Sequence, residues 1–302
     1  MSGRRILVGL VGANILKSLS PALHEDAFAA AGIRGHYHLM DLDRLQGCRL
    51  EQLFSAIKTA GFDGINVTFP CKQAIMPLLD EISAEARQIG AVNTVTISES
   101  GRTVGYNTDR IGFRRNFEDG LGRAAVEDQV AVLVGAGGAG CAVAFALMDL
   151  GAARVIVYDT DTARAAALVA DLMLHHGASR CRLADNLTDA FAGAAGVVNA
   201  TPVGMLGMPG NPVPAAALRP EHWVADVIYT PVETLLINAA LARGARVLTG
   251  GGMCVHQAVE TFRLFTGLAT DVARMHKTFA TALAARDAAI ASESRPRSTN
   301  AR

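Results

Sequence analysis

The sequence predicts an α/β protein of two domains, each built around a sheet covered by helices. Its 302 residues suit two domains of ordinary size, since a domain takes about 150 residues. Apolar runs short enough for buried strands alternate with helical patterns along most of the chain, which is typical of parallel sheets. A glycine-rich turn at 135–140 joins one such strand to the next helix and opens the second domain.

Two strands alternate with two helices in the first 60 residues. Ser20 is suited to cap the first helix, because its hydroxyl can accept a free backbone N–H, and Pro21 is favoured at the first helical position. Gly61 ends the second helix. We therefore expect a strand at 4–11, a helix at Pro21–Ala31, a strand at His36–Met40 and an amphipathic helix at Arg49–Ala60.

The next segment predicts a strand that breaks at Pro70 and leads into a helix carrying Lys72 and Gln73. Two β-rich runs around SESGR indicate a hairpin, and the sheet of this half should be largely parallel. The helix after the hairpin, with Thr108 or Asp109 as its N-cap, should bridge into the second domain. The expected elements are a strand at Ile65–Thr68, a helix at Ile82–Gln88 and a helix from about residue 109 to Asp119.

The middle of the chain predicts a βαβ unit that binds a dinucleotide. Val130–Val134 is typical of a strand buried on both faces. Gly135, Gly137 and Gly140 follow in GxGxxG spacing, which allows a tight turn, close approach of a pyrophosphate, and close packing of helix on strand. The N-terminus of the helix offers free N–H groups. Asp159 ends the next strand, where a carboxylate can accept hydrogen bonds from ribose hydroxyls. We therefore expect a doubly wound Rossmann-type domain.

The dinucleotide-binding sheet should be complete by about residue 248, so the last two helices are expected to return to the first domain. We predict a substrate-binding catalytic domain at 1–108, completed by helices at 249–290, and a dinucleotide-binding domain at 109–248. A tail at 291–302 offers little to bury and should be disordered. Beyond Asp159 we expect helices at Thr162–His176, Glu233–Arg243, Cys254–Phe265 and Asp271–Ala285, and strands near Arg180–Ala184, Val197–Thr201 and Val224–Tyr229.

Composition excludes several classes of function. With 28 basic and 28 acidic residues and no basic stripe, nucleic acid and anionic membranes are not expected partners. No run of about 18 apolar residues could span a bilayer. The five cysteines are odd in number and lack CxxC spacing, which indicates reduced thiols in a cytoplasmic protein, with neither a disulfide frame nor a metal site.

Eight motifs in order resemble the shikimate dehydrogenase family, and the likeness runs from Ile6 to about Phe279. The motifs are SLSPALH at 18–24, GINVTFPCK at 64–72, GAVNTV at 90–95, NTDRIGF at 107–113, GAGGAG at 135–140, NATPVGM at 199–205, DVIYTP at 226–231 and GMCVHQA at 252–258.

The resemblance implies a catalytic pair, Lys72 and Asp109, in which Lys72 takes the hydroxyl proton as hydride leaves and returns it in the reverse direction. Without the resemblance, Lys72 would be interpreted as a solvated helix residue and Asp109 as a helix cap. Ser18 and Ser20 resemble the hydroxyl pair that holds a substrate carboxylate. The other substrate-binding positions implied are Thr68, Asn93, Tyr229 and Gln257.

One departure bears on the cofactor. Members of the family that use NADP carry Asn-Arg-Thr where this chain has Asp159, Thr160 and Asp161, so the sequence is similar to the NAD-using quinate/shikimate dehydrogenase branch. Arg164 would face the adenine, although it would equally suit the solvent face of its helix. No metal is expected. The cofactor-binding positions implied are Gly135, Ala136, Gly137, Gly138, Ala139, Gly140, Asp159, Arg164, Thr201, Pro202, Met205 and Gly252.

The expected activity is NAD-dependent oxidation of shikimate, quinate or both at the carbon-3 hydroxyl, giving 3-dehydroshikimate or 3-dehydroquinate by reversible hydride transfer. An NADP-dependent biosynthetic shikimate dehydrogenase is the nearest alternative. A ligand-sensing regulator on the same fold would be a different class of protein, but it would need the catalytic pair lost or a DNA-binding segment added. The sequence leaves substrate preference, direction and oligomeric state open, with a homodimer as one possible assembly.

Overall fold

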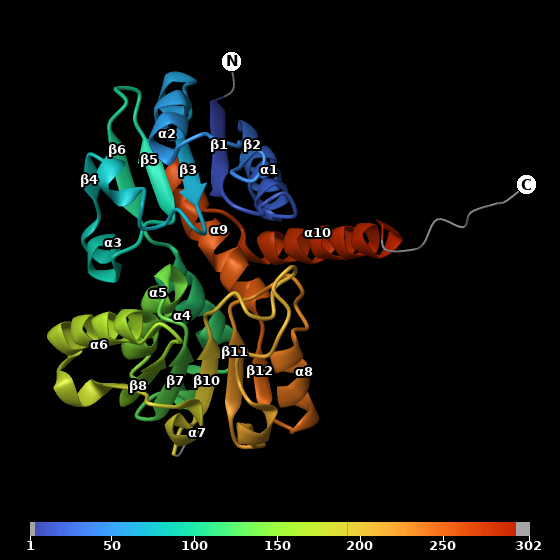
Figure 1. Ribbon diagram of the computed structural model, residues 1–302. Helices are drawn as coiled ribbons and strands as arrows, with labels where there is room; N and C mark the ends of the chain where they lie inside the picture. Colours follow the sequence, from blue (N-terminus) through green and yellow to red (C-terminus); the bar gives the residue numbers. More distant parts are fainter. Residues whose placement is uncertain (1–3, 192, 294–302) are drawn as a thin grey trace, which may run out of the picture.

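The computed structural model describes residues 4–191 and 193–293 and contains two six-stranded sheets, one in each of two lobes (Figure 1). The first lobe is formed by the first third of the chain together with the last two helices, and the second lobe by residues 123–248. Helix α4 (Asp109–Gly120) leads from the first sheet to the second, and α9 (Gly250–Thr266) returns beside it. The chain therefore crosses between the lobes twice.

The first sheet is mixed, with strand order β2-β1-β3-β5-β6-β4. Strands β1, β2 and β3 are mutually parallel, as are β6 and β4, but β5 runs antiparallel to both its neighbours because a hairpin turn joins it to β6. Five of the six strands therefore run in one direction, so the expectation of a largely parallel sheet is correct except at β5. The elements are β1 Arg5–Gly12, α1 Ser20–Ala30, β2 Arg34–Asp41, α2 Leu50–Thr59, β3 Gly64–Val67, β4 Glu81–Ile82, α3 Ala84–Ile89, β5 Thr94–Ile97 and β6 Thr103–Tyr106.

The second sheet is parallel throughout, with strand order β12-β11-β10-β7-β8-β9. This is the doubly wound order, in which the strand order reverses between β7 and β10 and ligands bind outside the carboxyl ends of those strands. The elements are β7 Val130–Val134, α5 Gly138–Asp149, β8 Arg154–Tyr158, α6 Thr162–His176, β9 Cys181–Leu183, α7 Leu187–Ala190, β10 Gly196–Asn199, β11 Trp223–Asp226, α8 Leu235–Ala242 and β12 Arg246–Leu248.

Helices α9 and α10 (Val272–Glu293) pack on the first lobe, as expected for the last two helices. Phe262 and Phe265 of α9 and Phe279 of α10 share one buried apolar cluster with Val8 and Phe28. Figure 1 shows α9 crossing diagonally beneath the first sheet and α10 extending to one side of it. The core of the first lobe therefore combines the two ends of the chain.

Three local predictions are wrong. Ser20 is the first residue of α1 and not its cap, because Leu19 occupies the N-cap position and no side chain caps the helix. Lys72 and Gln73 lie in turns before a short 3₁₀ helix at Met76–Leu78, not on an α-helix. Helix α10 continues to Glu293, so the start of the expected disordered tail is helical. The remainder of that tail, 294–302, lies outside the described residues.

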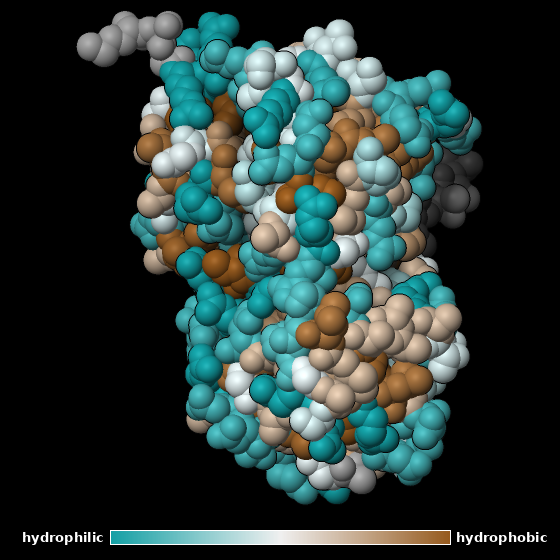
Figure 2. All heavy atoms as spheres, turned by 90° about the vertical axis from the view of Figure 1, so that its left-hand side faces the viewer, coloured by the Kyte–Doolittle hydropathy of each residue, from teal (hydrophilic) through white to brown (hydrophobic). Residues whose placement is uncertain are grey.

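Within residues 4–191 and 193–293, no helix is long and apolar enough to cross a bilayer. Figure 2 shows the two lobes one above the other, with hydrophilic and hydrophobic residues interspersed over the face it presents.

Candidate active site

The edge of the first sheet that faces the second lobe gathers polar residues from distant segments. Ser18 follows β1, Thr68 follows β3, and Asp109 follows β6. Asn93 immediately precedes β5, and because β5 is antiparallel to β3 its start lies at the same edge. The topology therefore brings together side chains that the sequence separates by up to about 90 positions.

Lys72, Asp109 and Gln257 form a hydrogen-bonded triplet at this edge. Lys72 Nζ lies 2.6 Å from Asp109 Oδ2, and Gln257 Nε2 donates to Asp109 Oδ1 at 2.7 Å. The Asp109 side chain is 2% exposed and that of Lys72 is 16% exposed. A buried carboxylate needs such partners. With both carboxylate oxygens engaged, Asp109 is fixed in orientation while Lys72 keeps access to a ligand.

Asn93 is buried, and most of its amide is committed to the protein. Its Oδ1 accepts the Thr108 N–H at 2.8 Å and the Thr94 hydroxyl at 3.0 Å, and its Nδ2 donates to Thr108 Oγ1 at 3.0 Å. A side-chain amide has two N–H donors, so one donor of Asn93 remains for a ligand. Asn93 thus also fixes the segment that leads into Asp109.

Ser18 and Ser20 come together in front of α1. Ser18 Oγ lies 3.1 Å from Ser20 Oγ and accepts the Ser20 backbone N–H at 3.2 Å. The hydroxyl of Tyr229 lies near that of Ser18, and burial raises the pKa of Tyr229 above its usual range, which keeps it a neutral donor. Three hydroxyls therefore converge on one spot. Thr68 is half-buried, and its backbone N–H donates to the Val11 carbonyl at the end of β1.

The glycine-rich loop has the geometry that its spacing predicts. Gly135 has a φ of 102° and a Cβ there would lie 2.8 Å from Thr201, while a Cβ on Gly140 would lie 2.0 Å from the Gly135 carbonyl. By contrast, a Cβ on Gly137 would meet nothing within 4 Å. Gly137 caps α5 without a side-chain partner, so the first N–H groups of α5 are open to an anion.

Asp159 holds this loop in place. Its Oδ2 accepts the Ala136 N–H at 2.7 Å and its Oδ1 accepts the Asp161 N–H at 2.9 Å. The Thr160 hydroxyl also donates to Oδ1, at 3.4 Å. A carboxylate has about four acceptor positions, so about one remains for a ribose hydroxyl. Arg164 pairs with Asp161 at 3.1 Å and lies 3.9 Å from Asp159. The arginine is therefore tied to acidic neighbours on its own helix turn.

The remaining expected cofactor positions divide into two sets. Thr201 and Pro202 follow β10, where Thr201 Oγ1 donates to Asn199 at 2.7 Å, and Met205 lies in the next turn. Thr201 borders the glycine-rich loop, since a Cβ on Gly135 would lie 2.8 Å from its Cγ2. Gly252 lies instead within α9, and a Cβ there would be 2.0 Å from Asn116 Oδ1 of α4. Close packing of α9 on α4 is thus sufficient to explain that glycine.

The two lobes meet at Lys72. A Cβ on Gly138, the first residue of α5, would lie 3.5 Å from Lys72 Cδ. The aliphatic stem of the lysine therefore lies across the start of the helix that should bind the pyrophosphate. This contact places the charged triplet directly beside the start of α5 and the glycine-rich loop that leads into it.

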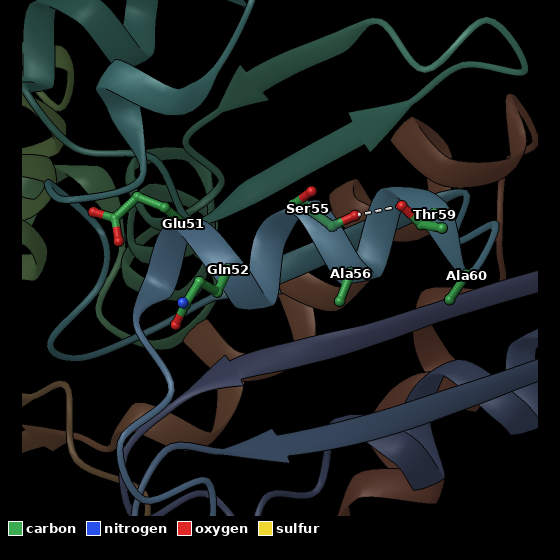
Figure 3. Close-up of a pocket in the computed structure, with 6 residues that line it drawn as sticks. All are labelled: Glu51, Gln52, Ser55, Ala56, Thr59 and Ala60. Atoms are coloured by element: carbon green, nitrogen blue, oxygen red, sulfur yellow. Dashed lines mark hydrogen bonds between the residues drawn. The ribbon is translucent and has the colours of Figure 1, made fainter.

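Two hollows elsewhere on the surface have no such chemistry. One of about 670 Å³ lies on the outer face of α2, lined by six exposed residues of that helix and its end (Figure 3). Another of about 570 Å³ lies beside the first residues of β1 and β2. The dashed bond in Figure 3 is helical, from the Thr59 hydroxyl to the Ser55 carbonyl. Neither hollow contains a residue of the Lys72 triplet, so neither is the candidate site.

Asn66 is a polar residue that was not predicted to belong to the site, although it lies within the GINVTFPCK motif at 64–72. Its Nδ2 donates to the Asn93 carbonyl at 3.2 Å and to Thr94 at 3.0 Å, and its Oδ1 accepts the Tyr37 hydroxyl at 2.8 Å. A half-buried asparagine inside an apolar strand was the available signal. Asn66 therefore links the Tyr37 hydroxyl to the Asn93 network.

Comparisons with known proteins agree with this geometry. Residues 10–95 match the family model of the shikimate dehydrogenase substrate binding domain. A quinate/shikimate dehydrogenase (NAD(+)) of Corynebacterium efficiens is 47% identical over 283 residues, which is 92% of this chain and 99% of that protein. The chain belongs to the shikimate dehydrogenase family. A shikimate dehydrogenase (NADP(+)) of Streptomyces avermitilis, another family member, is 49% identical over 89% of this chain and 93% of its own length.

Among solved structures, the quinate dehydrogenase from Corynebacterium glutamicum in complex with NAD superposes with a TM-score of 0.84. It is 44% identical and covers 92% of this chain and 100% of that chain. The resemblance and the two-domain fold expected from the sequence are both confirmed by this family match.

Proposed function

We propose that this protein is a quinate/shikimate dehydrogenase that oxidises shikimate, quinate or both at the carbon-3 hydroxyl, reversibly and with NAD. The observation that carries the proposal is the Lys72, Asp109 and Gln257 triplet facing the glycine-rich loop across the Gly138 contact. Dehydrogenation needs a proton acceptor at the hydroxyl oxygen and a hydride acceptor at the carbon that bears this oxygen, and this arrangement offers places for both.

The second lobe fits NAD. The open backbone at Gly137 and the uncapped start of α5 suit a pyrophosphate, and Asp159 keeps an acceptor position for the adenosine ribose. When bound, NAD supplies the acceptor for the hydride. Thr201 borders the same loop, and it is assigned with Pro202 and Met205 to the nicotinamide side, and Arg164 to the adenine side.

Lys72 is assigned as the group that moves the proton. Its Nζ, held by Asp109 at 2.6 Å, takes the proton of the reacting hydroxyl during oxidation and returns it during reduction. Asp109 and Gln257 keep that nitrogen in place. Because the Lys72 stem lies across the start of α5, the same contact fixes its distance from the cofactor's binding loop.

The three hydroxyls of Ser18, Ser20 and Tyr229 are assigned to the substrate carboxylate. They bind an anion directionally without placing a second cation beside Lys72. Thr68, Gln257 and the free N–H of Asn93 are assigned to the ring hydroxyls. A Cβ on Gly252 points at Asn116, so we assign that glycine to helix packing and not to ligand contact.

The NADP alternative is less favoured because the residue at the ribose position is an acid. Asp159 would repel a 2′-phosphate, and the nearby Arg164 is already paired with Asp161. A non-catalytic regulator is disfavoured by the intact ion pair of Lys72 and Asp109.

We also propose that the domains follow the expected division, with residues 109–248 inserted between 1–108 and the helices at 249–290. A homodimer and a cytoplasmic location stay predictions, and light scattering of the purified protein tests the first of them.

The experiment that tests the function follows NADH or NADPH absorbance with shikimate and with quinate as substrates. We expect oxidation of at least one acid with NAD and a lower kcat/KM with NADP. No turnover of either acid with either cofactor would contradict the proposal.

A further inference from the structure

The loop that carries Tyr229 is held by a residue of the C-terminal helix. This loop, 227–234, follows β11, and Arg286 of α10 reaches it with two donors. Arg286 Nη1 donates to the Thr230 hydroxyl at 2.6 Å, and Nη2 lies 3.4 Å from the Tyr229 carbonyl. In Figure 1 this part of the chain rises from the second lobe to the underside of α10.

The burial of Arg286 shows that these bonds matter. Its side chain is 8% exposed, and a guanidinium is costly to remove from water unless its donors are satisfied. Its remaining charge partner is Asp287, 3.0 Å away and 54% exposed. Asp287 is the neighbouring residue on the same helix, so it cannot by itself explain why Arg286 points at the loop.

Helix α10 is a firm base for this contact. Arg274 near its start makes two bonds to Asp26 of α1, at 2.7 and 2.8 Å, and Thr278 donates to the same carboxylate at 2.9 Å. Phe279 is buried, with its ring 6.1 Å from that of Tyr229 in an edge-on arrangement. A guanidinium on this helix is therefore fixed relative to α1, which begins with Ser20.

We propose that Arg286 is a positioning residue that holds the Tyr229 hydroxyl beside Ser18 for the substrate's carboxylate. The proposal rests on the function given above and adds to it a residue outside the eight family motifs. It assigns α10 a role in substrate affinity as well as in the core of the first lobe.

The charge of Arg286 adds to the geometric effect. Burial raises the pKa of Tyr229, and the nearby Ser18 hydroxyl and the Arg286 charge oppose that rise. The positive charge therefore leaves the phenol O–H a better donor to a carboxylate than burial alone would. The ligand class is thus anionic, and an uncharged analogue of the same ring should benefit less.

The test is a double-mutant cycle of Arg286→Ala and Tyr229→Phe, measured with shikimate or quinate and NAD. Because the lost interaction is one hydrogen bond to a charged ligand, Arg286→Ala should raise the substrate KM about 5- to 30-fold. The NAD KM should change less than about twofold. In the Tyr229→Phe background the same substitution should change the substrate KM by less than about twofold, because the two residues act as a unit.

Lys277→Ala is the matched control, since it removes another basic side chain of α10, one that is exposed to solvent and has no part in anchoring the helix to α1. It should leave the substrate KM unchanged. Thr230→Val removes only the acceptor of Arg286 Nη1 and covers the case in which Arg286→Ala does not fold. It should raise the substrate KM in the same direction by a smaller factor.

The outcomes separate this inference from the proposed function. Wild-type protein that oxidises neither acid overturns both. Active wild-type protein in which Arg286→Ala and Thr230→Val leave the substrate KM unchanged overturns only the role of Arg286. Equal KM increases from Arg286→Ala with and without Tyr229→Phe would show that Arg286 does not act through Tyr229.

Discussion

The two sides of the candidate active site are built by different means. On the side of the second lobe, one continuous βαβ unit presents backbone N–H groups and a single carboxylate, Asp159. On the side of the first lobe, side chains from several separate segments converge on Lys72 and Asp109. A pyrophosphate can be bound by main-chain geometry, whereas proton transfer and ring recognition need particular side chains. The first lobe should therefore determine the reaction and the substrate, and the second lobe the cofactor.

The largest effect should come from the proton-transfer group. Lys72→Ala should lower kcat by about 10²–10⁴-fold while NAD still binds, because the substitution removes the proton acceptor and leaves the glycine-rich loop intact. Asp109→Asn should act in the same direction. Steady-state kinetics together with NAD titration by fluorescence measure both properties. Lys58→Ala, on the exposed face of α2, is the control, and near-normal turnover of Lys72→Ala would refute the assignment.

A substitution on the other side should change the cofactor and not the chemistry. Asp159→Ala removes the ribose acceptor and also the bond that holds the Ala136 N–H, so the KM for NAD should rise about 10- to 100-fold. The preference for NAD over NADP should fall. Kinetics with both cofactors measure this effect. Asp161→Ala, which leaves the Ala136 bond in place, is the matched control, and an unchanged KM for NAD in Asp159→Ala would contradict the role of Asp159.

A smaller change is expected within the substrate-binding side. Quinate has a tertiary hydroxyl beside its carboxylate, where shikimate has a ring double bond, so the hydroxyls near Ser20 should discriminate between the two acids. We expect wild-type protein to use shikimate at least as well as quinate, and Ser20→Thr to shift the kcat/KM ratio toward quinate. A methyl group in a pocket is worth ~1–3 kcal/mol, so the shift should not exceed about 10–200-fold. An identical ratio in both proteins would show that residue 20 does not discriminate.

Acid should affect the two lobes in opposite directions. Burial lowers the pKa of His24 in the first lobe to about 3, so the unfolded chain binds the extra proton and stability is lost as pH falls below 6.5. Burial raises the pKa of Asp226 in the second lobe to about 6, so the folded chain binds the proton first and stability is lost as pH rises through 6.

Thermal or denaturant unfolding at pH 7 and pH 5 separates these contributions. Between pH 7 and pH 5, the free energy of unfolding of the wild-type protein should fall by about 2 kcal/mol relative to that of His24→Gln. Relative to that of Asp226→Asn, the free energy of unfolding of the wild-type protein should rise by about 1 kcal/mol over the same interval. Differences that do not depend on pH would show that neither group titrates as its burial implies.

The same contrast explains what the sequence could predict. The glycine-rich loop, α5 and Asp159 lie close together in the chain and each obeys a local rule, so their arrangement is predictable from spacing. The contact between Lys72 and Asp109 depends on how β3 and β6 lie in one sheet, and no spacing rule gives it; the resemblance to a family suggested it. The helix expected at Lys72 is absent because the segment after Pro70 forms successive turns. Arg286 lies far from every motif, and only the packing of α10 reveals its contact with Thr230.

The shared core of the first lobe has a consequence for biosynthesis. Val8 and Phe28 are made before the second lobe, but Phe262, Phe265 and Phe279, which pack in the same cluster, are made only after it. The first sheet must wait with an exposed apolar face while the whole second lobe is synthesised and can fold independently beside it. A ribosome stalled before residue 250 would thus present a finished cofactor lobe beside an unfinished substrate lobe that is open to chaperones and proteases.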